Sequence, residues 1–384
     1  MRIRELDGIR GMAICLVIAC HYAVFARQAF RLPQFGWIGV DIFFVLSGYL
    51  ITSILLNLKG QPGAFRTFYY RRFLRIFPPY WMALFAITVS ALLAGDRTLL
   101  RPATLLTNLA LQQSFEGFPE LITRVWSGIH FGPVNLLQKG GLPQNFAGLS
   151  GKISDSTGVL WSLSIEEYFY LLWAPIVLCC KRRTISLLAV VICFAAVFVR
   201  WFGFTGRFCY FSIFYRFDTL IFGALIALLP PLRRCWSLTI IIASAIGLAS
   251  ILLWIRPFLG LDIRESPLFM VFGLPLICSF VAGSISFLVN SSGAKTPVHL
   301  VLRSRPLTAI GTISYTLYLI HGFVYLTLLQ WFKSDLVGLA AVPLSLGLAA
   351  LSWIYVEKPI LSYKDRPPVE GLRKLLVASA TQAN

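Results

Sequence analysis

The feature that most constrains this chain is a series of long apolar runs, each about as long as a bilayer-crossing helix. Such a helix needs about 20 apolar residues, and inside lipid only helices and closed barrels satisfy their own backbone hydrogen bonds. The runs in the 384-residue chain cover 9–27, 37–57, 76–94, 159–180, 184–201, 211–229, 236–255, 266–289, 307–332 and 336–356. They predict an all-α, polytopic membrane protein with about ten transmembrane helices.

Composition excludes the main soluble classes. Charged residues make up 13% of the chain and hydrophobic residues 57%, whereas a soluble domain carries about 25% charged residues. A water-soluble enzyme and a disordered chain are therefore excluded. The eight cysteines show no spacing typical of a zinc site or a disulfide framework, so we expect no metal.

The distribution of basic residues predicts the orientation. The net charge is +18, which in a soluble protein would suggest nucleic acid. Here the majority of the Lys and Arg residues lie in segments that the positive-inside rule assigns to the cytoplasm if both termini are cytoplasmic. We therefore expect that topology, with Arg200 in an outer segment, membrane lipids as partners and no nucleic acid.

The same topology predicts a single membrane domain over residues 1–357. Residues 95–158 form a long outer loop in this scheme, and 358–384 form a short cytoplasmic tail. The apolar piece 102–113 is too short to span upright. We expect it to be re-entrant or interfacial.

Charged and titratable residues inside a span are expensive and are functional-site candidates. Arg10 and His21 are eleven residues apart, which places them on one helix face about 16 Å apart along the axis. Arg10 alone could be an interfacial arginine that reaches the headgroups, and His21 alone could bond a neighbouring helix. A histidine is also the usual general base for a hydroxyl.

Glu166, Glu167 and His321 complete the catalytic candidates. Glu166 and His321 are predicted to lie at a depth similar to that of His21, which permits a buried His/Glu cluster. A carboxylate beside His21 could fix its tautomer, or it could contact the acceptor instead.

Arginines near the cytoplasmic face are candidates for holding phosphate. Arg72 and Arg75 are one helical turn apart, and Arg303 and Arg305 lie in the last inner segment. Arginine forks bind phosphate oxygens in a bidentate manner, so these residues and Arg10 could hold the diphosphate of a cytosolic cofactor. A positive-inside signal or an anionic-lipid contact is the alternative.

Other polar groups fall within the spans, namely Asp41 with Ser47, Arg216 with Asp218, and Tyr318. They could contact substrate or serve structure. For Arg216 and Asp218 we expect pairing with neighbouring groups.

Six segments, taken in order, resemble the acyltransferase-three family of bacterial membrane O-acyltransferases. They are 6–10 (LDGIR, with His21 eleven residues on), 39–49 (GVDIFFVLSGY), 71–78 (RRFLRIFP), 160–170 (LWSLSIEEYFY), 215–218 (YRFD) and 313–321 (ISYTLYLIH).

The resemblance implies transfer of an acyl group, commonly acetyl, from cytosolic acyl-CoA to a hydroxyl. The family's acceptors are mostly sugars or glycoconjugates of the cell surface or of secreted polysaccharide, free or lipid-linked. Its arginine–histidine pairing maps to Arg10 and His21, and its paired arginines map to Arg72 and Arg75. It also implies a bacterial cytoplasmic-membrane enzyme, here in a form without the C-terminal serine-hydrolase-like domain of many members.

Two alternatives stay open on the sequence. Intramembrane histidine and glutamate could form the proton relay of a transporter, although no inverted repeat is visible. An acyltransferase with a lipid acceptor fits the residues nearly as well.

Overall fold

The computed structural model describes residues 3–25, 32–101, 104, 108, 152–203, 208–255, 263–334 and 337–364. These residues are largely helical and include no β-strand, so the predicted all-α class is confirmed. Most of the expected outer loop 95–158, with its re-entrant piece 102–113, and most of the tail 358–384 lie outside the described residues.

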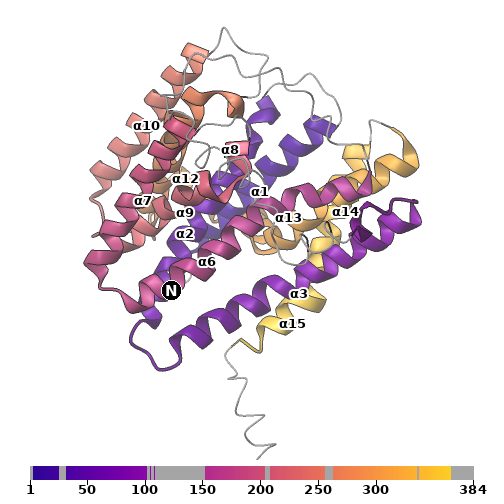
Figure 1. Ribbon diagram of the computed structural model, residues 1–384, viewed down its shortest axis with the longest axis horizontal. Helices are drawn as coiled ribbons and strands as arrows, with labels where there is room; N and C mark the ends of the chain where they lie inside the picture. The colour runs from indigo at the N-terminus through magenta and orange to yellow at the C-terminus, as the bar shows by residue number, and fades with distance from the viewer. Residues whose placement is uncertain are drawn as a thin grey trace, which may run out of the picture.

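Figure 1 shows the helices of the described part. The long helices are α1 (Arg4–Phe25), α2 (Ile38–Leu58), α3 (Ala64–Leu93), α6 (Leu160–Cys179), α7 (Arg182–Gly203), α9 (Ile213–Leu228), α10 (Arg234–Ile255), α11 (Leu274–Asn290), α13 (Arg305–Phe332) and α14 (Val337–Ser352). The shorter elements are η1 (Leu32–Trp37), η2 (Thr98–Leu100), η5 (Ile153–Val159), α8 (Phe208–Phe211), η7 (Ile263–Glu265), η8 (Phe269–Gly273), α12 (Pro297–Leu302), η9 (Trp353–Glu357) and α15 (Lys358–Leu361).

Eight helical segments of the described residues are long and apolar enough to cross a membrane. The two remaining expected spans are also helices. Helix α1 begins with a charged stretch, RELDGIR, and α9 has only 16 residues. Helix α3 begins at Ala64, well before the apolar run at 76–94, because the basic stretch before that run is also helical. Arg72 and Arg75 therefore lie inside this helix. The eight apolar helical segments make the protein an integral membrane protein.

Helices α1 and α13 lie side by side in the middle of the bundle (Figure 1) and pack extensively against each other. Glycines permit this close approach. A Cβ at Gly11 would overlap the backbone carbonyl oxygen of Leu307, and one at Gly311 would overlap that of Asp7. Larger side chains at these positions would force the two helices apart, so the glycines fix how the polar residues of both helices face each other.

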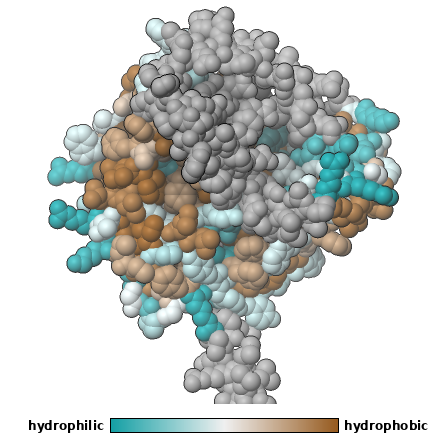
Figure 2. Space-filling model, in the orientation of Figure 1, coloured by the Kyte–Doolittle hydropathy of each residue, from teal (hydrophilic) through white to brown (hydrophobic). Residues whose placement is uncertain are grey.

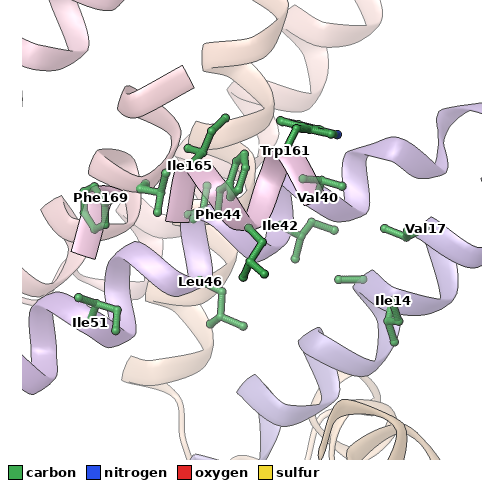
Figure 3. Packing of buried hydrophobic residues seen from close by; sticks show 14 of the residues in the cluster. Ile14, Val17, Val40, Ile42, Phe44, Leu46, Ile51, Trp161, Ile165 and Phe169 are labelled. Atoms are coloured by element: carbon green, nitrogen blue, oxygen red, sulfur yellow. The ribbon is translucent and has the colours of Figure 1, made fainter. Parts of the chain in front are cut away.

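A second close pair of helices, α2 and α9, forms the other part of the core. Gly48 of α2 and Gly223 of α9 each touch the backbone of the partner helix. Figure 3 shows how apolar side chains of α1, α2 and α6, among them Ile14, Phe44 and Ile165, meet between these helices. The core is thus built where these helices converge.

Helices α7 and α10 face outward over much of their length. Within their most apolar windows, 22% of the α7 residues and 11% of the α10 residues are buried. Figure 2 shows brown, hydrophobic atoms on the flank where Figure 1 places these helices. Phe194 and Ile246 are examples, 73% and 62% exposed. Such a surface fits contact with lipid chains rather than with water.

The end of α3 is tied to η5 outside the spans. The backbone N–H of Thr98 donates to Asp96 Oδ1 at 2.9 Å. Partial burial alone would raise the pKa of Asp96, but hydrogen bonds from Ser154 and Thr98 and the charge of Lys152 lower it to about 2. Asp96 is therefore ionised at neutral pH and helps to hold η5 at the end of α3.

Candidate active site

Two histidines from distant parts of the chain meet at the contact between α1 and α13. His21 Nδ1 lies 2.7 Å from His321 Nε2, and the rings stack with centroids 4.9 Å apart and an interplanar angle of 12°. His321 is fully buried, whereas His21 is partly exposed. The structure therefore brings together the two histidines that the sequence placed at similar depth.

The backbone fixes which ring nitrogens carry protons. His321 Nδ1 lies 2.7 Å from the carbonyl oxygen of Tyr318, and a carbonyl can only accept, so Nδ1 carries the hydrogen. In a neutral ring Nε2 of His321 then bears a lone pair and accepts from His21 Nδ1–H. This chain of hydrogen bonds puts the lone pair of His21 on Nε2.

Aromatic and hydroxyl groups surround the histidine pair. The Tyr22 hydroxyl donates to the backbone carbonyl of His321 at 3.1 Å and lies 3.2 Å from Ser345 Oγ. The Tyr318 hydroxyl donates to the carbonyl of Val159 at 3.0 Å and lies 2.6 Å from Ser162 Oγ. Tyr318, a predicted polar candidate, thus joins α13 to the beginning of α6.

Arg264 was not among the sequence candidates, yet it lies near His21. It interacts electrostatically with His21. Its guanidinium carbon is 5.8 Å from the ring centroid of Trp37, 5.2 Å from that of Tyr210 and 5.8 Å from that of Phe211. Its position just before the apolar run 266–289 made it look like an ordinary outer-segment charge, and only the fold places it near His21.

A second polar region lies nearer the beginning of α1. We term it the basic cluster and define it as Arg10, Arg72, Arg75, Glu166 and Glu167. Arg10 interacts electrostatically with Arg72 and Glu166, and Arg75 interacts with Arg10 and Arg72. Three arginines thus share one region with two carboxylates. The like charges are held together inside the bundle, which favours an anionic ligand between them.

Glu166 is held in the basic cluster by two hydroxyl groups. Ser47 Oγ donates to its Oε1 at 2.8 Å, and the Tyr170 hydroxyl donates to its Oε2 at 3.1 Å. We had grouped Ser47 with Asp41 from the sequence, but in the structure Ser47 bonds Glu166. The observed partner of His21 Nδ1 is His321, so a histidine occupies the position in which we had considered a carboxylate.

Arg72 and Arg75 line one side of the basic cluster from α3. The guanidinium carbon of Arg72 lies 6.0 Å from the ring centroid of Tyr170. That of Arg75 lies 5.6 Å from the ring centroid of Trp353. Glu167 adds a buried Oε1 without a hydrogen-bond partner. Such an atom is costly to bury unless a ligand or a proton satisfies it.

Glu357, at the end of η9, also reaches this region. It is 2% exposed. Thr316 Oγ1 donates to its Oε1 at 2.7 Å, and its Oε2 lies 3.8 Å from Arg75 Nη1. In the sequence this residue is only the last of the expected membrane domain, 1–357. The signal that could have found it is an acidic side chain directly after an apolar run.

The two arginines of the last inner segment differ in what they contact. Arg303 forms an ion pair with Glu5 and donates to the carbonyl of Ala294 at 3.0 Å, so its donors face protein groups. Arg305 lines a cavity of about 330 Å³ together with Arg4 and Asp7. Of the two, Arg305 is the better placed to bind an anion.

The remaining predicted residues, Asp41, Arg216 and Asp218, form together with Arg200 what we call the paired cluster. Arg216 bonds Asp41, and Arg200 bonds Asp218 with Nη–Oδ distances of 2.6 and 3.1 Å. All four side chains are 0% exposed. The expected pairing of Arg216 and Asp218 with neighbours is confirmed. Arg200, which we expected among the charges of the outer segments, is drawn into the bundle by its ion pair with Asp218.

Comparison with known proteins identifies the family of this chain. The model of the acyltransferase domain of family 3 matches residues 3–356, a range that contains both histidines and the basic cluster. The peptidoglycan O-acetyltransferase OatA of Listeria monocytogenes is 28% identical over 375 residues, covering 93% of this chain and 55% of the relative. The O-acetyltransferase OatA of Staphylococcus aureus strain NCTC 8325 is 24% identical, covering 92% of this chain and 56% of the relative.

A protein of Komagataeibacter xylinus, named as a candidate membrane-bound transacylase, BcsY, is 25% identical and covers 98% of this chain and 89% of its own length. The chain spans about half the length of the O-acetyltransferases that it matches. No solved structure matches it. The match over residues 3–356, nearly the whole chain, shows that this protein belongs to acyltransferase family 3.

Proposed function

We propose that this chain is a membrane O-acyltransferase that moves an acyl group, with acetyl as the first candidate, from cytosolic acyl-CoA to a hydroxyl of a cell-envelope sugar. The observation that carries the proposal is the hydrogen-bonded pair of His21 and His321, which presents an oriented imidazole within reach of a basic cluster. The names of the relatives support a peptidoglycan sugar as the acceptor. Their family supports a location in the bacterial cytoplasmic membrane.

In this proposal His21 Nε2 is the general base. It takes the proton of the acceptor hydroxyl while the hydroxyl oxygen attacks the thioester carbon. The carbon–sulfur bond then breaks, and the thiolate of CoA takes the proton back from His21. The bond to His321 Nε2 stabilises the imidazolium that forms in between, much as a carboxylate does in a triad. His321 therefore acts as a positioning residue for His21.

The basic cluster binds the donor in this scheme. CoA carries several negative phosphate oxygens, and arginine forks are the side chains best suited to them. Arg10 and His21 lie on one helix about 16 Å apart along the axis, and the pantetheine arm of CoA can span that distance. Phosphates held by Arg10, Arg72 and Arg75 thus leave the thioester near His21.

The test uses the purified protein in liposomes. Acetyl-CoA is supplied with peptidoglycan fragments, with lipid-linked peptidoglycan precursor or with phospholipid alone, and products are analysed by mass spectrometry. We expect an increment of one acetyl group on a sugar hydroxyl. Acetylated phospholipid would redirect the proposal to a lipid acceptor. No transfer from acetyl-CoA to any acceptor would contradict it.

A further inference from the structure

Glu357 is a buried acid that the proposed chemistry leaves unused. Its side chain is 1% exposed, and Thr316 Oγ1 holds Oε1 at 2.7 Å. Its Oε2 is buried and makes no hydrogen bond. A buried carboxylate with one unsatisfied oxygen is destabilising unless a nearby charge compensates it. The compensating charge that the structure offers is Arg75.

The guanidinium of Arg75 has protein neighbours on two sides, and part of its side chain is exposed to solvent. Its Nη1 lies 3.8 Å from Glu357 Oε2, and its guanidinium carbon lies 5.6 Å from the centre of the Trp353 ring. Its side chain keeps 23% exposure. Arg10 and Arg72 repel it electrostatically. Without Glu357 that repulsion and the long, flexible side chain would let the guanidinium turn away.

A purely structural ion pair looks different in this protein. Arg200 and Asp218 make two short hydrogen bonds, and both side chains are 0% exposed. The contact between Glu357 and Arg75 is single, longer than a hydrogen bond and open on the arginine side. Such a pair orients Arg75 without occupying its donors, so the donors stay available to a ligand.

We propose that Glu357 is a positioning residue that holds Arg75 in the orientation in which it binds a phosphate of the acyl donor. Thr316 in turn fixes Glu357. The inference rests on the proposed function, because it takes acyl-CoA as the donor. It adds a residue of the last helical segment to the donor site, and it assigns α3, α13 and η9 to one phosphate-binding unit.

The experiment compares two donors that share the thioester and differ in phosphate. Acetyl-CoA carries phosphates, whereas S-acetyl-N-acetylcysteamine has none. For Glu357→Gln we expect the KM for acetyl-CoA to rise roughly tenfold, because Arg75 would lose about one charge-assisted contact with the phosphate. The KM for the phosphate-free thioester should stay as in the wild type. The larger part of the effect should fall on KM rather than on kcat.

A double-mutant cycle tests whether Glu357 acts through Arg75. In an Arg75→Ala background, Glu357→Gln should raise the KM for acetyl-CoA no further. Thr316→Val serves as the second variant if Glu357→Gln folds poorly. It keeps the side-chain shape and the carboxylate but removes the fixing hydrogen bond, so it should give a smaller rise in the same KM.

The outcomes separate this inference from the function on which it rests. Wild-type protein that transfers no acetyl group from acetyl-CoA overturns the proposed function, and this inference with it. If the wild type is active, three results overturn this inference alone. They are an unchanged KM for acetyl-CoA in the Glu357 or Thr316 variant that folds, an equal rise for both donors, and additive effects in the Arg75→Ala background.

Discussion

The paired cluster and the basic cluster are both built from arginines and carboxylates inside the helix bundle, yet they differ in accessibility and in how closely the charges pair. In the paired cluster two arginines bond two aspartates, and every side chain is 0% exposed. In the basic cluster Arg75 keeps 23% exposure, and its nearest carboxylate oxygen, on Glu357, is 3.8 Å away. Closely paired and sealed charges hold helices together, whereas accessible arginine donors leave room for an anion.

Aromatic rings contact arginines in both clusters. The guanidinium carbon of Arg216 lies 4.4 Å from the Tyr210 centroid and 5.5 Å from the Phe44 centroid, so two rings enclose the ion pair. The guanidinium carbons of Arg72 and Arg75 lie 6.0 Å from the Tyr170 centroid and 5.6 Å from the Trp353 centroid. An intramembrane charge is therefore a site candidate only after its partners and its access to solvent are known.

The histidine pair gives the largest expected effect on the functional side of this comparison. His21→Gln keeps hydrogen bonding but removes the base, so acyl transfer should fall by about 10²–10⁴-fold. Acetyl transfer is measured in protein that folds as the wild type does.

The matched control is His299→Gln. His299 is 0% exposed, as is His321, but it contacts Ser291 and Thr296 at 3.0 and 2.7 Å, away from the pair. Folded His299→Gln protein should retain transfer. Substantial turnover by His21→Gln protein would contradict the assignment of the base.

Breaking the paired cluster should destabilise the protein. Asp41→Asn leaves Arg216 as a buried charge without its counter-ion, which typically costs about 3–5 kcal/mol. We expect a large drop in the thermal unfolding midpoint in detergent.

Asp41→Leu combined with Arg216→Met removes both charges and should recover most of that stability. A stable Asp41→Asn protein that has lost acyl transfer would instead move Asp41 into the site. The distinction between the two clusters would then fail.

Arg72→Ala should affect donor binding rather than stability, the opposite of Asp41→Asn. Arg72 is partly exposed, so its loss should change the unfolding midpoint little, while the KM for acetyl-CoA rises roughly tenfold with the lost charged hydrogen bond. Steady-state kinetics with varied acetyl-CoA measure this. If KM stays unchanged while stability falls, the basic cluster is structural as well.

Asp96 gives the smallest effect and tests stability outside both clusters. Its pKa is lowered to about 2 in the folded protein, against about 3.9 for an unperturbed aspartate. The carboxylate therefore contributes stability above about pH 4, and this contribution is lost as pH falls toward 2. Unfolding midpoints of wild type and Asp96→Asn should differ at pH 5 and converge at lower pH. A constant difference would contradict the shift.

Part of this molecule could be predicted from the sequence. The apolar runs identified the long helices, and Arg72 and Arg75 were predicted to be neighbours if the segment before the third run is helical, which the start of α3 at Ala64 bears out. His21 and His321 were identified as candidates because a titratable residue is rare within apolar runs. These predictions depend on local composition and helical period, which the chain carries in every segment.

The partners of the polar groups could not be predicted in this way. Asp41 bonds Arg216 rather than lying with Ser47, Arg200 lies inside the bundle, and Glu357 faces Arg75. Each contact joins residues from different helices, so it depends on how those helices cross.

The sequence by itself determined the membrane class, the helices and the residue types available for chemistry, because the bilayer imposes one length and one hydrogen-bonding rule on every span. The tertiary structure decided which charges are neutralised and which stay available. Backbone contacts at glycines such as Gly11 and Gly311 set the crossing of α1 and α13. That crossing brings His21 to His321; position along the chain predicted their similar depth but not which helices would be neighbours.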